Sequence, residues 1–132
     1  PEDTGNYVNH ILQTEDQQFT IYYKDKFVGL IGFKDTDTTN RKLEIGYWLS
    51  QYVQGKGIMT QSVQKVVEFA FNELAMNRIQ IKVAVDNMKS RSIPERLGFR
   101  FEGIERDGEL LVDNKYTDIA IYGLLRKEFQ QK

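Results

Sequence analysis

Several short stretches of the chain alternate between hydrophobic and polar residues, which is the period-two pattern of half-buried β-strands. The clearest is "KLEIGYWL" (residues 42–49), where alternate residues beginning at Leu43 would face one side of the sheet and those beginning at Glu44 the other. The same pattern predicts strands in "FTIYYKDKFVGLIGF" (19–33), "RIQIKVAV" (78–85), "FRFEGIER" (99–106) and "YTDIAIYGLL" (116–125). Residues 19–33 would form two strands of an antiparallel hairpin that turns at Lys24-Asp25-Lys26.

Three other stretches carry helical signals. Hydrophobic residues recur at helical spacing from Met59 to Leu74, so this helix would pack one face on a sheet. A short helix is predicted over residues 90–97, ended by Gly98 in a left-handed conformation. Another is predicted over residues 3–13, with Asp3 or Thr4 as its N-cap.

With a polar loop over residues 35–41, the predicted order is α-β-β-β-α-β-α-β-β. This order predicts a mixed sheet flanked by helices, in the α/β (α+β) class. We find no repeat, low-complexity segment or linker, so residues 1–132 are expected to form one domain.

Two glycines, Gly55 and Gly57, stand where a strand leads into a helix. A helix N-terminus has backbone N–H groups without internal partners, and glycines allow a phosphate to approach them closely. Lys56 would add a positive charge, and Thr60 a hydroxyl group. The stretch fits neither a Walker A loop nor a Rossmann fingerprint. A tight turn that binds nothing is the alternative.

The composition excludes several kinds of catalytic and binding site. The chain has no cysteine and one histidine, His10, which excludes disulfides, a thiolate nucleophile, and Cys-ligated or two-His metal sites. A magnesium site made of Asp and Glu alone stays open, but no clustered carboxylates indicate one, so no metal is expected. A balance of 18 Lys+Arg against 19 Asp+Glu gives no general field for nucleic acid or an anionic membrane. No hydrophobic run reaches the roughly 20 residues that span a bilayer, and no secretory signal is visible. A reduced, cytoplasmic setting is expected.

Two linked signatures resemble those of the GNAT superfamily of N-acetyltransferases. "QGKGIM" (54–59) is similar to its Gln/Arg-x-x-Gly-x-Gly/Ala loop, with Gln54 and Gly57 in matching places. "NMKSRSIPERLGFRFEG" (87–103) is similar to its second signature, an Asn followed by a short helix ending in Leu-Gly-Phe and then Glu-Gly. "EIGYWL" (44–49) and "YTDIAIYGLL" (116–125) are closest to the RimJ/RimL branch, which acetylates the α-amino group of ribosomal proteins.

The resemblance runs from about Thr4 to the C-terminus and implies a mixed, mostly antiparallel GNAT sheet with flanking helices. The chain begins near the family's second helix, so the family's first strand and helix are expected to be absent. Met59 stands where the loop usually has Gly or Ala, which a helix's first turn tolerates because the amide is kept. Pro94 stands where many members carry a tyrosine that protonates the leaving thiolate.

The resemblance implies acetyl-CoA as cosubstrate. Its pyrophosphate would bind the loop, mainly through backbone amides, at Gln54, Gly55, Lys56, Gly57, Ile58, Met59 and Thr60. The strand before the loop is expected to splay away from the next parallel strand. In that gap the backbone at Trp48 and Leu49 would pair with the pantetheine and polarise the thioester carbonyl. Asn87 and Ser90 complete the expected cofactor-binding set.

Three residues are candidates for proton transfer. Glu44 or Glu109 would deprotonate the amine, and Glu109 lies ten residues after Phe99, where RimL-like enzymes place a glutamate. Both also fit an ordinary solvated carboxylate. Ser90 would replace the missing tyrosine as thiolate donor, because RimL-like enzymes carry serine there. It would also serve as N-cap of the short helix, with Asn87 closing the turn before it.

The expected acceptor is the α-amino group of a ribosomal or other protein. A small amine (an antibiotic or polyamine) and a non-catalytic CoA-binding module are the alternatives. Tyr116, Asp118 and Tyr122 would line the acceptor side or belong to the core. A homodimer is possible, whereas no nucleic-acid or membrane partner is expected.

Overall fold

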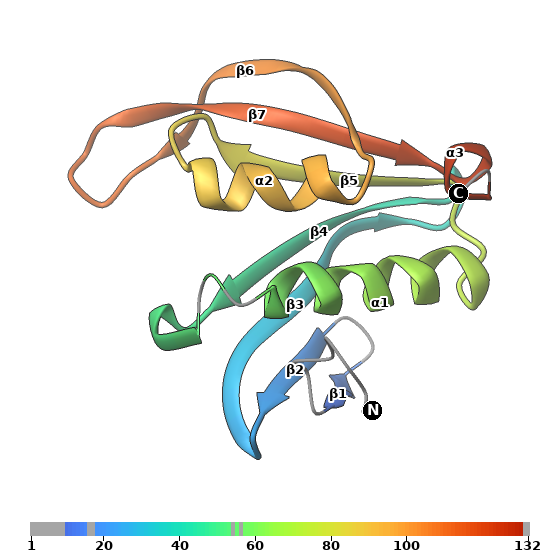
Figure 1. Cartoon of the computed structure of the whole chain (residues 1–132). Coiled ribbons are helices and arrows are strands. Elements are labelled where there is room, and N and C mark those ends of the chain that lie inside the picture. The colour runs from blue at the N-terminus through green and yellow to red at the C-terminus, as the bar shows by residue number, and fades with distance from the viewer. Residues whose placement is uncertain (1–9, 16–17, 54, 56, 131–132) are drawn as a thin grey trace.

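The computed structural model describes residues 10–15, 18–53, 55 and 57–130, which form one sheet and the helices beside it (Figure 1). The elements in chain order are β1 (His10–Glu15), β2 (Gln18–Tyr23), β3 (Lys26–Asp37), β4 (Lys42–Leu49), the 3-10 turn η1 (Gln51–Val53), α1 (Ile58–Asn72), β5 (Arg78–Ala84), α2 (Met88–Arg96), β6 (Arg100–Leu110), β7 (Tyr116–Leu125) and α3 (Arg126–Gln130). The sheet has seven strands in the order β1-β2-β3-β4-β5-β7-β6. Its neighbouring strands are antiparallel except β4 and β5, which are parallel. The predicted mixed, mostly antiparallel class is confirmed.

One predicted helix is wrong. Residues 10–13 of the helix expected over 3–13 belong to strand β1, and residues 3–9 lie outside the described part of the chain. β1 pairs with β2 along its length, with Ile11 opposite Ile21 and Leu12 opposite Thr20. The neighbouring strand supplies a backbone hydrogen-bond partner, and this tertiary pairing outweighs a weak local helical pattern.

Other elements begin or end a few residues away from the predicted boundaries. β3 continues to Asp37, so the expected loop over residues 35–41 is reduced to the turn at its end. The second helix begins at Met88 rather than Ser90, and β6 continues beyond Arg106 to Leu110. Leu74 was expected on the buried face of α1, but it follows the helix and is 37% exposed.

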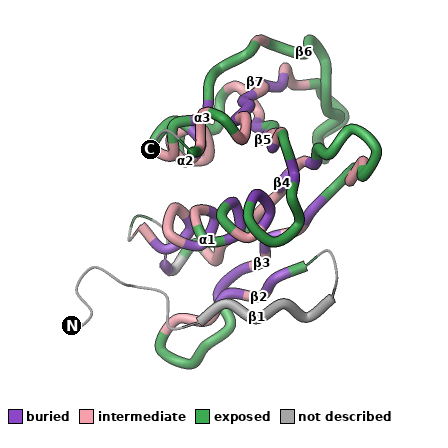
Figure 2. Tube along the Cα trace, turned by 90° about the vertical axis from the view of Figure 1, so that its right-hand side faces the viewer, coloured by how far each residue is buried: buried purple, intermediate pink, exposed green. Residues whose placement is uncertain are grey.

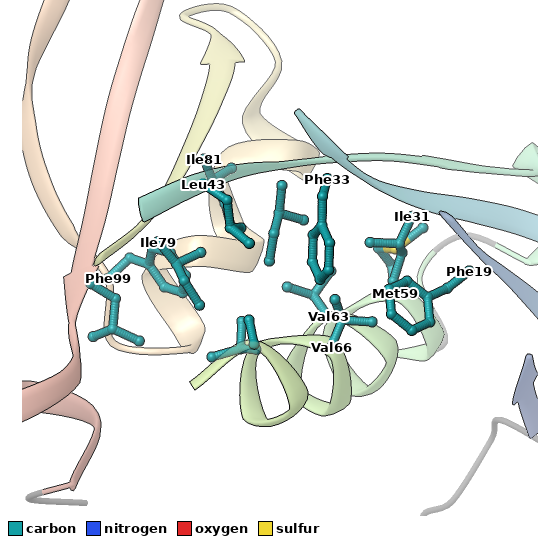
Figure 3. Close-up of a cluster of buried hydrophobic side chains, with 14 of the residues drawn as sticks. Phe19, Ile31, Phe33, Leu43, Met59, Val63, Val66, Ile79, Ile81 and Phe99 are labelled. Carbon is teal, nitrogen blue, oxygen red and sulfur yellow. The ribbon is translucent and has the colours of Figure 1, made fainter. Parts of the chain in front are cut away.

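The core lies between α1 and the sheet. In Figure 3, Met59, Val63 and Val66 of α1 point toward the sheet residues above them. Phe33 lies among these sheet residues, and its ring makes an edge-to-face contact with Phe19 at a centroid distance of 5.4 Å. Burial of each such side chain contributes roughly 1.5–3 kcal/mol. Figure 2 shows buried residues along α1 and the middle strands, whereas the edge strand β6 is exposed over most of its length.

The sheet opens between its two parallel strands. β4 and β5 pair only from Lys42 opposite Arg78 to Glu44 opposite Gln80. Beyond that point β4 follows β3 to Leu49, while β5 follows β7 over its whole length. The two strands diverge toward their carboxyl ends (Figure 1), as the resemblance implied. From Ile45 to Trp48, the inner edge of β4 therefore has no strand paired with it among the described residues.

Candidate active site

A cleft of about 380 Å³ lies at this gap between β4, the glycine loop and α2. On one side it is lined by Trp48, Leu49, Gly55 and residues 57–60, and on the other by Asn87 and Ser90. These are the described members of the expected cofactor-binding set, and the structure brings them together. Gln54 and Lys56, the two other members, lie outside the described residues.

The glycine loop leaves the start of α1 open. Gly55 and Gly57 have φ angles of +84° and +76°, a left-handed conformation that glycine adopts without strain. Gly57 is the N-cap of α1, and no described side chain caps the helix there. The first intrahelical hydrogen bond runs from the Gln61 amide to the Gly57 carbonyl at 3.0 Å. The amides before Gln61 are left for an anion, which the helix dipole also favours.

Ile58 and Met59 contribute to this site through their backbone. Their side chains are 0% and 4% exposed and belong to the core, as Figure 3 shows for Met59. The core therefore anchors the first turn of α1, and both residues still line the cleft. Met59 can stand where relatives of the motif have Gly or Ala because its side chain turns away from the cleft.

The opposite wall begins at the start of α2. Asn87 is the N-cap, since its side-chain oxygen accepts a hydrogen bond from the Ser90 amide at 3.1 Å. The expectation that Ser90 caps this helix is therefore wrong: Ser90 is the third residue inside it. This frees the Ser90 hydroxyl from capping, and no described residue hydrogen-bonds to it.

A second contact fixes Ser90 from the β4 side. An α-helical carbonyl normally accepts a hydrogen bond from the amide four residues later, but for Ser90 that residue is Pro94, which has no N–H. The Tyr47 hydroxyl instead donates to the Ser90 carbonyl at 3.0 Å. Burial raises the pKa of the Tyr47 phenol well above its usual range, so it stays a protonated donor.

Tyr47 was not among the expected site residues, because the alternation of β4 placed it beside Ile45 and Leu49 without indicating a chemical role. Two features of the sequence could have indicated the contact between Tyr47 and Ser90. A tyrosine on a buried face needs a partner for its hydroxyl, and a proline inside a helix leaves a carbonyl without a donor.

Glu44 lies away from the cleft. It lines a second, smaller cavity of about 170 Å³ at the closed end of the strand pair, together with Asp35, Lys42 and Lys82. Burial raises the pKa of its carboxyl group, and the nearby Lys82 and Lys34 oppose this effect. Four residues separate it from Trp48 along β4, roughly 13 Å.

Glu109 is also outside the cleft lining. It lies on the exposed strand β6 opposite Thr117 of β7, near the end of that hairpin. The structure thus does not bring Glu44, Glu109 and Ser90 together. Among the other acceptor-side candidates, Tyr116 is exposed, whereas Tyr122 is buried and donates to Glu95 at 2.7 Å.

Lys89 and Arg96 also line the cleft and were not expected there. With Ser92 and Ile93 they occupy positions i, i+3, i+4 and i+7 of α2, so they share one helix face. This spacing was readable from the sequence. Among the described residues, no group of His, Asp or Glu that could hold a metal ion was found, and no described helix is long and hydrophobic enough to cross a membrane.

Comparison with known proteins agrees with this geometry. Residues 1–100 match the model of the acetyltransferase (GNAT) domain. The chain is 44% identical over 110 residues to the Bacillus subtilis protein named "Putative ribosomal N-acetyltransferase YdaF", covering 83% of this chain and 60% of that protein. It is 35% identical over 106 residues to the Escherichia coli ribosomal-protein-serine acetyltransferase, covering 80% and 59%.

A solved structure of RimL, a ribosomal L7/L12 α-N-protein acetyltransferase in complex with coenzyme A, superposes with a TM-score of 0.79 and 29% identity, covering 84% of this chain and 62% of that one. The chain thus spans about 60% of the length of the two curated relatives described above. Over that span, sequence and fold agree on one assignment. The chain belongs to the GNAT acetyltransferase family.

Proposed function

We propose that the protein is an acetyl-CoA-dependent N-acetyltransferase that transfers the acetyl group directly to a primary amine, the α-amino group of a ribosomal or other protein. The observation that carries the proposal is the uncapped N-terminus of α1, with Gly57 in a left-handed conformation, at the point where β4 and β5 separate. A pyrophosphate fits such a site because free amides and the helix dipole both favour an anion.

Acetyl-CoA supplies an acyl group activated as a thioester. The open edge of β4 before the loop offers backbone groups that would hydrogen-bond the pantetheine, as an added strand does. The backbone around Trp48 and Leu49 would bind the thioester and stabilise the negative charge that develops on its carbonyl oxygen. These donors are held by the pairing of β4 with β3, so they need little rearrangement during the reaction.

Ser90 would supply the proton to the thiolate that leaves when the carbon–sulfur bond breaks. Its amide is held by Asn87 and its carbonyl by Tyr47, while its hydroxyl has no partner among the described residues. Backbone atoms fixed at both ends would hold the hydroxyl at the cleft. General acid catalysis by a positioned side chain typically contributes about 10²–10⁴-fold to the rate.

A base must take the proton that the amine loses on acylation. Glu44 is our first candidate, because burial raises its pKa toward the range in which a base works at neutral pH. Since it lies outside the cleft, it would act through water along the face of β4 that it shares with Trp48. Glu109 is the second candidate and would reach the amine only if the acceptor extends along the β6–β7 hairpin.

A protein acceptor is favoured by the surface beside the cleft. The Trp48 ring is stacked on Phe27 with centroids 6.3 Å apart, and these residues are 55% and 49% exposed. An exposed aromatic pair of this kind offers apolar contact area to a peptide that follows the reacting amine. The ribosomal-protein names of the relatives reported above support the same acceptor class.

The test is an acetyl-transfer assay that measures released CoA thiol, with peptides from ribosomal-protein N-termini and with spermidine as acceptors. Ser90→Ala should lower kcat at least about tenfold and leave acetyl-CoA affinity within about threefold. Ser92→Ala is the matched control, because that hydroxyl already donates to the Lys89 carbonyl at 2.6 Å. Binding of acetyl-CoA without turnover on any acceptor would favour the CoA-binding module instead.

A further inference from the structure

The charged residues that line the cleft, within the described part of the chain, are Lys89 and Arg96. Both lie on α2 and both are basic. Seven residues, or about 10 Å of helix, separate their backbones, and the i, i+7 spacing places them on the same face. The cleft therefore has a positive wall opposite the positive N-terminus of α1.

Three basic residues of strands β5 and β6 have carboxylate partners. Arg78 pairs with Glu102 at 2.6 Å, Lys82 with Glu105 at 3.6 Å and Arg100 with Glu128 at 3.3 Å. Neither Lys89 Nζ nor the Arg96 guanidinium has a carboxylate partner among the residues that the structure describes. Two unpaired like charges on one wall of a cleft attract an anionic ligand.

The ligand that fits both walls carries two separate anionic groups. The amides at the start of α1 account for one group, which the proposed function assigns to the pyrophosphate. The cations of α2 are then available to a second anionic group on the same molecule. Coenzyme A carries a phosphate on the 3′-oxygen of its ribose, at a distance from the pyrophosphate.

We infer that Lys89 and Arg96 bind the ribose 3′-phosphate of coenzyme A, so that the protein distinguishes coenzyme A from its dephospho form. The guanidinium of Arg96 can donate two parallel hydrogen bonds to phosphate oxygens, and the Lys89 ammonium adds a point charge. This inference rests on the proposed cosubstrate, but it does not depend on the acceptor or on turnover.

The test is calorimetric titration of the chain with coenzyme A and, separately, with dephospho-coenzyme A. The chain should bind coenzyme A at least about tenfold more tightly, since a charge-assisted hydrogen bond contributes about 10–100-fold. In Lys89→Gln/Arg96→Gln this preference should fall to less than about threefold, through loss of affinity for coenzyme A alone. Each single variant should lose part of the preference, and the salt dependence of coenzyme A binding should decrease.

Lys65→Gln is the matched control, because Lys65 is an exposed cation of α1 outside the cleft lining. It should keep the full preference, and circular dichroism will verify that each variant is folded. Equal affinity of the unmodified chain for both ligands would overturn the inference alone. Variants that lose affinity for coenzyme A and dephospho-coenzyme A equally would overturn the inference and assign the cations to the pyrophosphate instead. Binding of neither ligand would overturn the inference together with the cosubstrate assignment.

Discussion

Replacement of Tyr47 by phenylalanine removes one atom, the hydroxyl oxygen that donates to the Ser90 carbonyl at 3.0 Å. A typical hydrogen bond contributes about 0.5–1.5 kcal/mol, whereas a buried polar group left without a partner costs about 1–3 kcal/mol. The Ser90 carbonyl is closer to the second case, because Pro94 cannot replace the lost donor. Tyr47→Phe should therefore lower the free energy of unfolding by about 1–2 kcal/mol.

The free energy is measured by urea unfolding followed by circular dichroism, and it corresponds to a decrease of roughly 4–8 °C in Tm for a chain of this length. A double-mutant cycle with Pro94→Ala isolates the cause, because alanine restores an amide that can reach the Ser90 carbonyl. In that background Tyr47→Phe should cost about 1 kcal/mol less. An equal loss of unfolding free energy in both backgrounds would refute the argument that Pro94 leaves the Ser90 carbonyl dependent on Tyr47.

Three further predictions concern other parts of the framework. In Gly29→Ala the new Cβ would lie 2.6 Å from the Trp48 carbonyl oxygen, so β4 must shift; Tm and acetyl-CoA affinity should both decrease, and unchanged affinity would show that this part of β4 does not hold the cosubstrate. Burial raises the pKa of Glu44 above 4.5, so ionisation of this carboxyl group destabilises the fold. Glu44→Gln should therefore be more stable than the parent above the raised pKa and equally stable below about pH 4.5. Unfolding at several pH values measures this, and a stability difference that persists at low pH would contradict the raised pKa. Tyr122→Phe removes the hydroxyl that donates to Glu95 and should cost about 1–3 kcal/mol in urea unfolding; a loss below about 0.5 kcal/mol would mean that this contact does not hold α2.

The strands and the loop could be read from the sequence because their signals are local. Alternation in residues 42–49 and the helical spacing after Met59 both follow from burial of one face, and the structure has β4 and α1 in those places. β1 could not be read in this way. The stretch from His10 to Glu15 becomes a strand through its pairing with β2, and a pairing partner is not visible in the stretch itself.

The candidate site was predicted less completely for the same reason. The Tyr47–Ser90 contact joins residues 43 positions apart, so it depends on how α2 docks against β4. The position of Glu44 depends on which end of β4 meets β5, and the residue type alone does not reveal it. Asn87 and Ser90 were both recognised, but the cap was assigned to Ser90 instead of Asn87, since both side chains are common at helix starts.

The short pairing between β4 and β5 also has a thermodynamic consequence. Three residue pairs join the β1–β4 part of the sheet to the β5–β7 part, so the sheet has a seam that its own backbone does not close. A ligand that lies along the seam and hydrogen-bonds both sides would act as a reversible cross-link. At a concentration one hundred times its Kd, such a ligand adds about 2.7 kcal/mol to the stability of the chain. If acetyl-CoA is the cosubstrate, as proposed above, the seam couples the integrity of the fold to the supply of that ligand.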